Sequence, residues 1–231
     1  MIAKLTERNR QLEVIDRVLR HNFHNKINVI KGYAKMAARE AEDGVAAYVE
    51  TIDDAVDRLV ELVDKEHEIT QILSDPPAVE AFDVVPVVES AAATVAAKYP
   101  EATIETDLPE TCSVVASVEI GQAIAELIEN GVVYSESTDP TVVVAVATEG
   151  EMVRVSVSDE GKSIPEVEQR VHTGDADITQ LSHGLGLGLR LVSLLAEQSG
   201  GELEFETNEP QGSTVTLEFA TPSETAEEGC R

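Results

Sequence analysis

A run of alternating glycines and leucines in residues 181–195 carries the clearest sign of chemistry in this sequence. Gly184, Gly186 and Gly188 alternate with leucines, and a continuous amphipathic run begins at Leu189. Because glycine has no Cβ, its backbone N–H group can approach a ligand closely. A loop of this kind that opens onto a helix N-terminus can bind phosphate through unpaired N–H groups and the helix dipole. A flexible linker is the alternative, although linkers are not usually spaced by leucines.

Two other segments carry residue types that suit a phosphate ligand and its cation. Glu126 and Asn130 lie four residues apart in a predicted helix over residues 118–134, so they share a face. An amide oxygen beside a carboxylate is suited to Mg²⁺, a hard ion that also takes phosphate oxygens. Asp159 ends a predicted strand, and its carboxylate could accept a hydrogen bond from an adenine amino group, with Gly161 letting the base sit close. A turn-forming aspartate is the alternative.

A third candidate is His21, in a predicted helix near the N-terminus. At 100° per residue, Asn25 and Asn28 each fall within about 40° of His21, on a face away from the apolar stripe. Solvent should therefore reach the imidazole, whose neutral form has a free ring nitrogen that can accept a phosphoryl group. Taken alone, such a histidine is more often an ordinary surface residue.

The elements that would position these residues form two domains. Residues 1–75 show helical periodicity in two stripes, and Glu42-Asp43-Gly44 separates them. The expected stripes are Leu12, Ile15, Leu19, Phe23, Ile27, Ile30 and Ala34, then Val45, Val49, Ile52, Val56, Leu59 and Val63. The first helix is mainly basic and the second mainly acidic, which favours an antiparallel hairpin. Two helices cannot bury both stripes, so we expect a homodimeric four-helix bundle, the alternative being docking onto another partner or onto the second domain.

The second domain is expected over residues 80–220, after a proline linker at 74–77. Asp83 is a candidate N-cap for a helix over 84–98. Expected strands cover residues 102–106, 112–115, 141–147, 152–158, 203–207 and 214–219. The fold class is therefore α+β, with a mixed sheet on one side and helices on the other. Residues 221–231 are expected to form a disordered acidic tail.

Composition limits the possible partners. The chain has 231 residues, a formal net charge of −27 and 42% hydrophobic residues. This acidity argues against binding to nucleic acid or anionic membrane, yet the apolar content is that of a folded protein. With few lysines, it is typical of a cytosolic protein from a salt-loving microbe. No stretch is long and apolar enough to span a membrane, and no signal peptide is visible. Cys112 is interpreted as core filler and Cys230 as part of the tail.

Read in order, these segments resemble the ATP-binding domain of sensor histidine kinases, within the ATPase superfamily shared with Hsp90 and gyrase. The resemblance covers residues 80–220. It implies that Asn130 binds Mg²⁺ with Glu126 nearby, that Asp159 and Gly161 hold adenine, and that the glycine run holds the lid and the phosphates. It also implies that Tyr134 and Thr214 line the nucleotide.

The segment around His21 is similar to the phosphoacceptor box of histidine kinases, especially its haloarchaeal form. The resemblance implies that His21 accepts the phosphoryl group and passes it to a response-regulator aspartate. Asn22 stands where most relatives have a carboxylate; it can accept a hydrogen bond from the ring but is no base. Asn25 matches the residue that positions water during dephosphorylation of the partner. Only about 20 residues precede His21, so we expect no sensor domain in this sequence. Residues 1–20 would then be a coiled-coil input stub, or the sequence is a fragment or a kinase that senses through a partner protein.

Three departures from the family pattern leave other functions open. Val133 replaces a common lysine, Asn22 replaces an acid, and Ser163 replaces the second glycine of the adenine motif. If residue 163 needs a positive φ, serine costs about 1 kcal/mol or more. A phosphotransfer or phosphatase scaffold with a degenerate ATP domain is therefore one alternative. An ATPase that uses Glu126 to activate water is the other.

Overall fold

The structure, a computed structural model, describes residues 25, 26, 29, 30, 32, 33, 36, 45–165 and 185–222. These residues fall into two compact units. The first contains the described residues before Asp75 together with residues 185–187, and the second contains residues 75–165 and 188–222. The boundary after Ser74 coincides with the proline-rich segment that the sequence marks as a linker.

The first unit is helical. The described residues between 25 and 36 are helical, and α2 (Val45–Ser74) runs for 30 residues. Among the side chains of α2 that the structure describes, the buried apolar ones are Ala55, Leu62, Ile69, Ile72 and Leu73. In this single chain Val56, a member of the expected stripe, is 40% exposed, and its neighbour Ala55 is buried; the stripe itself stays a prediction. Hydrophobicity places a stripe on a helix, but the tertiary contacts of that helix decide which side is covered.

Most of the predicted first helix, including His21 and Asn22, lies outside the described residues, as does the loop at 42–44. The antiparallel hairpin and its dimer therefore stay predictions. None of the helices in the described part of the chain combines the length and the apolar character that crossing a bilayer requires.

The second unit alternates strands and helices. Its elements, in chain order, are β1 (Glu80–Asp83), α3 (Val85–Lys98), β2 (Thr103–Asp107), β3 (Ser113–Ala116), α4 (Ile120–Val133), β4 (Thr141–Glu149), β5 (Met152–Asp159), α6 (Leu185–Gln198), β6 (Glu202–Thr207) and β7 (Ser213–Ala220). The strands form one seven-stranded mixed sheet in the order β1-β3-β7-β5-β4-β2, with β6 also paired to β7. Only β2 and β4 run parallel among these pairs.

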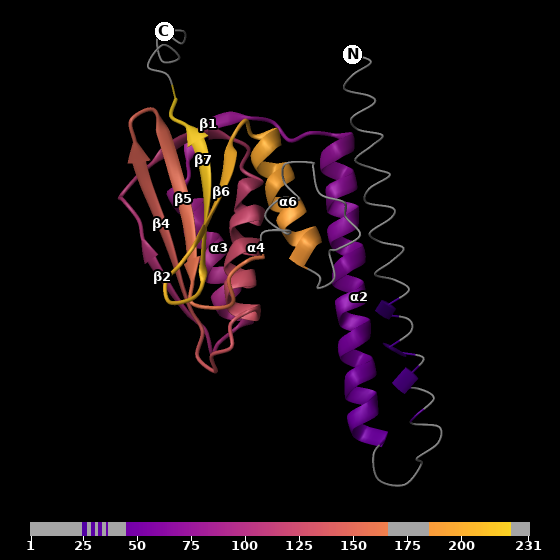
Figure 1. Cartoon of the computed structure of the whole chain (residues 1–231). Coiled ribbons are helices and arrows are strands. Elements are labelled where there is room, and N and C mark those ends of the chain that lie inside the picture. The colour runs from indigo at the N-terminus through magenta and orange to yellow at the C-terminus, as the bar shows by residue number, and fades with distance from the viewer. Residues whose placement is uncertain are drawn as a thin grey trace. The chain divides into compact units, whose positions relative to one another are not determined.

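The helices cover one face of this sheet, as Figure 1 shows for α3, α4 and α6. Strand alternation explains the choice of face. Val142, Val144 and Val146 of β4 are buried against the helices, whereas Val143 between them is 36% exposed. The leucines of α6 from Leu187 onward are buried almost all round the helix, so this part of α6 is a core element. The predicted sandwich is confirmed, and the sheet face away from the helices is called the open face below.

Three local features differ from the expectations or refine them. Strand β1 was not predicted. Helix α3 begins at Val85, and Asp83 is the last residue of β1. The Asp83 carboxylate nevertheless accepts hydrogen bonds from the N–H groups of Val85 (3.1 Å) and Cys112 (2.9 Å), so it joins the start of α3 to the chain before β3. Thr221, expected in the tail, donates its N–H to the Glu151 carbonyl at 2.9 Å.

Candidate functional site

The site begins with two side chains on α4. Glu126 is buried, with 8% of its surface exposed, and Asn130 follows one turn later. The Asn130 Nδ2 atom is buried and has no hydrogen-bond partner among the described residues. A buried amide normally satisfies both of its ends, so this one retains capacity for a ligand. The two ends of an amide have the same shape, and turning the group would present its oxygen instead.

A glycine brings this helix against the end of β5. A Cβ atom on Gly131 would lie 2.9 Å from Cγ2 of Val142 and 3.1 Å from Cβ of Asp159. Both distances are shorter than an ordinary contact, so only glycine allows α4 to approach the sheet this closely. The helix that carries Asn130 therefore rests directly on the strand end that carries Asp159.

Asp159 is partly buried, and its carboxylate is hydrogen-bonded to the backbone. Its Oδ1 atom accepts a hydrogen bond from Gly161 N–H at 2.7 Å. Burial raises the pKa of Asp159 above its usual value, and backbone hydrogen bonds from Gly161 and Ser213 oppose that rise. The carboxylate lies on the helix-facing side of β5, since it follows the buried Val155 and Val157 in the alternation.

The turn after Asp159 contacts the end of α4. A Cβ atom on Gly161 would lie 3.1 Å from the Tyr134 carbonyl oxygen and 3.3 Å from Cα of Ser135. Tyr134 in turn donates its N–H to the carbonyl of Asn130 at 3.0 Å. The structure thus brings four of the residues singled out from the sequence to one end of the sandwich: Asn130, Tyr134, Asp159 and Gly161.

The glycine run differs from the expected loop. Helix α6 begins at Leu185, so Gly186 and Gly188 lie inside the helix instead of before it, while Gly184 lies outside the described residues. Gly186 is in the first turn, where backbone N–H groups have no partner within the helix. A Cβ atom on Gly188 would lie 2.1 Å from Oε1 of Glu126. The absence of a side chain at Gly188 therefore lets α6 lie against the Glu126 carboxylate.

The expected strain at Ser163 is wrong. No described residue other than glycine has a positive φ, so Ser163 has an ordinary backbone conformation. Its hydroxyl donates to the Gly212 carbonyl at 3.0 Å, and the next N–H, of Ile164, donates to Ser213 Oγ at 2.9 Å. Serine at this position therefore fastens the turn after β5 to the start of β7.

Ser213 and Thr214 lie on opposite faces of β7. Ser213 is 2% exposed. Its hydroxyl accepts the N–H of Ile164, and its own N–H donates to the Asp159 carboxylate. The Thr214 hydroxyl instead bonds to Ser158 Oγ (2.8 Å) and Asn208 Oδ1 (3.0 Å), away from the Asp159 carboxylate. Ser213 and Asn208 thus contact the segment at Asp159, and the sequence analysis assigned neither of them a role. The Gly-Ser-Thr sequence contained the signal for Ser213, because neighbouring strand residues face opposite ways.

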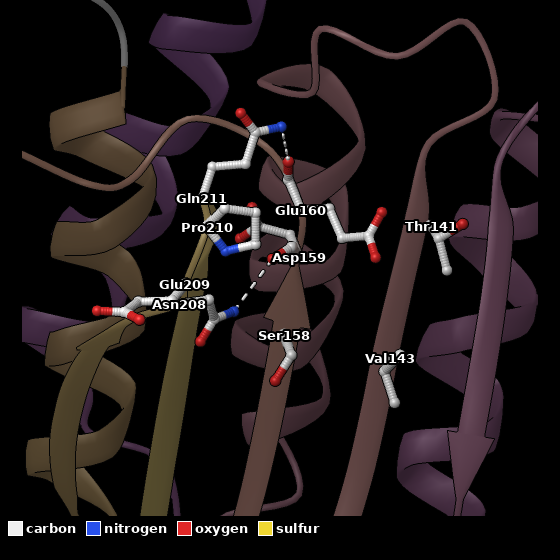
Figure 2. A pocket seen from close by; sticks show the side chains of 9 residues that line it. All are labelled: Thr141, Val143, Ser158, Asp159, Glu160, Asn208, Glu209, Pro210 and Gln211. Atoms are coloured by element: carbon white, nitrogen blue, oxygen red, sulfur yellow. Dashed lines mark hydrogen bonds between the residues drawn. The ribbon is translucent and has the colours of Figure 1, made fainter.

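A cavity of about 420 Å³ lies on the open face, beside the end of β5. Figure 2 shows its lining residues: Thr141, Val143, Ser158, Asp159, Glu160, Asn208, Glu209, Pro210 and Gln211. Thr141, Val143 and Ser158 alternate with buried residues that face the helices, so this hollow and the residues of α4 lie on opposite faces of the sheet. It is therefore separate from the group formed by Asn130, Tyr134 and Gly161.

Of the residues expected to take part in phosphoryl transfer near the N-terminus, the structure describes only Asn25. His21 and Asn22 are among the undescribed residues, whereas Asn25 is helical and exposed, as a residue on a solvent-facing side should be. Among the described residues, no three His, Cys, Asp or Glu side chains gather as a metal site.

Residues 116–223 match the family model described as "Histidine kinase-, DNA gyrase B-, and HSP90-like ATPase". The matched stretch contains the group of residues at Asn130 and Asp159 and the glycine run, but not His21. The predicted ATPase-type sandwich is confirmed for this part of the chain.

Two curated proteins illustrate the similarity in sequence. The circadian input-output histidine kinase CikA of Synechococcus elongatus is 37% identical over 101 residues, which cover 42% of this chain and 13% of CikA. The sensor histidine kinase YkoH of Bacillus subtilis is 24% identical over 211 residues, which cover 87% of this chain and 46% of YkoH. The chain thus spans less than half the length of both relatives.

A solved structure extends the comparison to the fold. The histidine kinase AdeS of Acinetobacter baumannii is similar with a TM-score of 0.64 and 18% identity, over 88% of this chain and 98% of that chain. At 18% identity this similarity supports the fold and no more specific property.

Proposed function

We propose that this chain is the core of an ATP-dependent protein histidine kinase, in which the second unit binds ATP and His21 accepts the phosphoryl group. The observation that carries the proposal is the juxtaposition of Asn130, with its unpartnered buried amide, and the Asp159–Gly161 turn within one ATPase-type sandwich. The similarity to CikA and YkoH supports it.

In this proposal each end of the nucleotide has its own residues. The Asp159 carboxylate accepts a hydrogen bond from the amino group of adenine. Gly161 lets the turn that carries Asp159 pack against the end of α4, and Tyr134 lines the base. The phosphates approach the first turn of α6, where the N–H groups at Gly186 and its neighbours, with Gly184 ahead of them, suit negative charge. Gly188 keeps α6 close enough to Glu126 for both to border the same space.

Mg²⁺ fits the donors that the chain offers at the phosphate end. Asn130 would hold the ion through its amide oxygen and Glu126 through its carboxylate, directly or through water, with phosphate oxygens completing the coordination. When bound, the ion supplies neutralisation of phosphate charge. The protein residues supply position: α4 fixes Asn130 and Glu126 on one face, and Gly131 fixes α4 on the sheet.

The transfer step needs a neutral imidazole on His21. Its unprotonated ring nitrogen attacks the γ-phosphorus, a phosphorus–nitrogen bond forms, and the bond from the γ-phosphorus to the bridging oxygen breaks to release ADP. The other ring nitrogen then loses its proton to water. Asn22 can accept a hydrogen bond from that N–H and so orient the ring, although it cannot take the proton. Asn25, exposed one turn later, would position water when the partner is dephosphorylated.

The remaining parts of the proposal concern partners and setting. A response-regulator receiver domain takes the phosphoryl group from His21, a homodimer forms through the N-terminal helices, and an upstream protein supplies the signal. The net charge of −27 supports a cytosolic setting at high salt and disfavours nucleic acid as a partner.

The experiment is a labelling assay with γ-³²P-ATP and Mg²⁺, run on the purified chain from low to multimolar KCl. We expect acid-labile label on the protein that His21→Ala abolishes and Asn25→Ala retains. An intact wild-type chain that binds ATP yet takes up no label at any salt concentration would overturn the kinase proposal.

A second candidate function rests on the position of Glu126, which is buried beside the start of α6. A carboxylate there could act as a general base toward water, which would make the domain an ATPase. Steady ATP hydrolysis that survives His21→Ala but not Glu126→Ala would favour this function over the kinase. Hydrolysis that depends on His21 would exclude it.

A further inference from the structure

The loop between β6 and β7, residues 208–212, binds the turn that follows β5. Two of its side chains donate to main-chain carbonyls there: Asn208 Nδ2 to Asp159 at 3.1 Å and Gln211 Nε2 to Glu160 at 2.9 Å. The close-up in Figure 2 shows both bonds. The two partners in each bond are 49 and 51 residues apart in the chain. The loop therefore acts as a tertiary support for the residues that would hold the base.

Asn208 is the better fixed of the two donors. Its Oδ1 atom accepts the Thr214 hydroxyl at 3.0 Å, and Thr214 is bonded to Ser158 Oγ at 2.8 Å. Its backbone N–H donates to the Gly212 carbonyl at 3.0 Å. Because Thr214 engages the oxygen end of the amide, the nitrogen end is directed at the Asp159 carbonyl. By contrast, Gln211 is exposed, and its side-chain amide donates to the Glu160 carbonyl from the solvent-facing side of the loop.

The hairpin backbone also closes on the Asp159 carbonyl. Gly212 has φ +110°, and a Cβ atom there would lie 2.1 Å from Asp159 O. The carbonyl of Asp159 is thus enclosed by Asn208 and Gly212, while its carboxylate is held by Gly161 and Ser213 N–H groups. When the peptide plane that contains the Asp159 carbonyl is held in place, the directions in which the Asp159 side chain can point are limited as well.

We propose that Asn208 is a positioning residue for nucleotide selectivity: acting from the open face of the sheet, it holds the Asp159 main chain so that the carboxylate meets the amino group of adenine. This inference rests on the proposed role of Asp159. The property under test is selectivity between ATP and ITP. ITP has a carbonyl oxygen where ATP has the 6-amino group, so a carboxylate that faces position 6 meets an acceptor in place of a donor. A misdirected carboxylate loses the bond to ATP and gains nothing for ITP.

The experiment measures Kd for ATP and for ITP by calorimetry on the full chain, in Asn208→Asp, Asn208→Ala and the wild type. We expect the wild type to prefer ATP by about ten-fold or more, since a hydrogen bond to a charged group is lost with ITP. Asn208→Asp keeps the shape but replaces the donor with an acceptor that faces a carbonyl oxygen, so the preference should fall to about three-fold or less. Asn208→Ala removes the donor altogether and should lower the preference for ATP to the same extent.

Three controls separate positioning from general loosening of the loop. Gln211→Ala removes the neighbouring bond to the same turn and should keep the wild-type ATP/ITP ratio. Thr214→Val should lower the ratio because the amide loses its orienting hydroxyl, and Thr214→Ser should restore it. A purely structural role for Asn208 would weaken ATP and ITP equally and leave the ratio unchanged, which would overturn the inference.

Asp159→Asn distinguishes this inference from the proposed function. If that variant loses or inverts the preference while the Asn208 variants keep it, Asp159 reads the base and Asn208 does not position it. If Asp159→Asn leaves the ratio unchanged, or if the wild type binds neither nucleotide, the assigned role of Asp159 fails and the inference fails with it.

Discussion

Gly188 of α6 faces the carboxylate of Glu126 of α4 so closely that a Cβ atom at residue 188 would lie 2.1 Å from Glu126 Oε1. The glycine run therefore does more than free the backbone near a phosphate. It lets a core helix approach a buried carboxylate, and Glu126 cannot keep its position if residue 188 gains a side chain.

Gly188→Ala should impair nucleotide chemistry more than stability. Alanine favours the helix by about 1 kcal/mol over glycine, which offsets part of an overpacking cost of about 1–3 kcal/mol, and Glu126 can rotate away. We therefore expect a small change in Tm with a clear loss of Mg²⁺-dependent ATP turnover or labelling. In the Glu126→Ala background the same change should cost less stability, because the contact is gone. Equal costs in both backgrounds, measured by thermal unfolding, would contradict the contact.

Asp159 predicts a dependence of stability on pH. Burial raises its pKa in the folded protein, so the protonated form is favoured by folding. The corresponding stabilisation is complete below the unfolded pKa near 3.8 and is lost as pH rises through the folded pKa. The ionised carboxylate thus destabilises the nucleotide-free domain at neutral pH. We expect wild type to gain stability relative to Asp159→Asn as pH falls from 7 to 4, measured by urea unfolding without nucleotide. A difference that does not change over this range would rule out the raised pKa.

Tyr99 joins the end of α3 to α4 beside the predicted metal ligand Asn130. Its hydroxyl donates to Glu129 Oε1 at 2.6 Å, and Lys98 Nζ lies 2.5 Å from the same oxygen. Burial, then the Glu129 carboxylate, raises the pKa of Tyr99 to about 12. The hydrogen bond stabilises the fold below the unfolded pKa of about 10 and is lost as pH rises from 10 to 12.

Tyr99→Phe should therefore lower the free energy of unfolding by about 0.5–1.5 kcal/mol at pH 8. The deficit should shrink when urea unfolding is repeated above pH 10. Glu129→Gln is the matched variant, since it keeps an acceptor but removes the charge that raises the tyrosine pKa. A deficit of constant size from pH 8 to 11 would mean that the Tyr99 hydroxyl is not the stabilising group.

We expect replacement of Ser163 by glycine, the residue that the resembling adenine motif has at this position, to be harmful. The backbone at 163 is unstrained, and the hydroxyl bonds to the Gly212 carbonyl at 3.0 Å. Ser163→Gly should lower stability, because it removes about 0.5–1.5 kcal/mol of hydrogen bonding and adds chain freedom. Ser163→Ala removes the hydrogen bond without adding the chain freedom of glycine, so it separates the two contributions to the loss of stability. A gain in stability or in ATP affinity for Ser163→Gly, by calorimetry, would show that serine is a strained substitute after all.

Periodicity predicted the strands and helices of the second unit because their apolar residues repeat at the spacing of each element. The β-branched run over residues 141–147 predicted a strand, and the structure has β4 there, at Thr141–Glu149. The short strand Glu80–Asp83 escaped prediction, since its four residues are half exposed and its pairing with β3 comes from a distant segment.

Residue types and their order along the chain by themselves determined the chemistry at the site: a carboxylate and an amide four apart on one helix, an aspartate before a glycine, and a run of glycines. Only the tertiary structure decided which of these groups meet. It placed Gly188 against Glu126, turned Ser213 toward Asp159 and Thr214 away from it, and brought Asn208 to the Asp159 carbonyl across 49 residues of chain. The physical reason is that spacing along one element fixes the face a side chain takes, whereas contacts between elements depend on how the whole sheet and its helices pack.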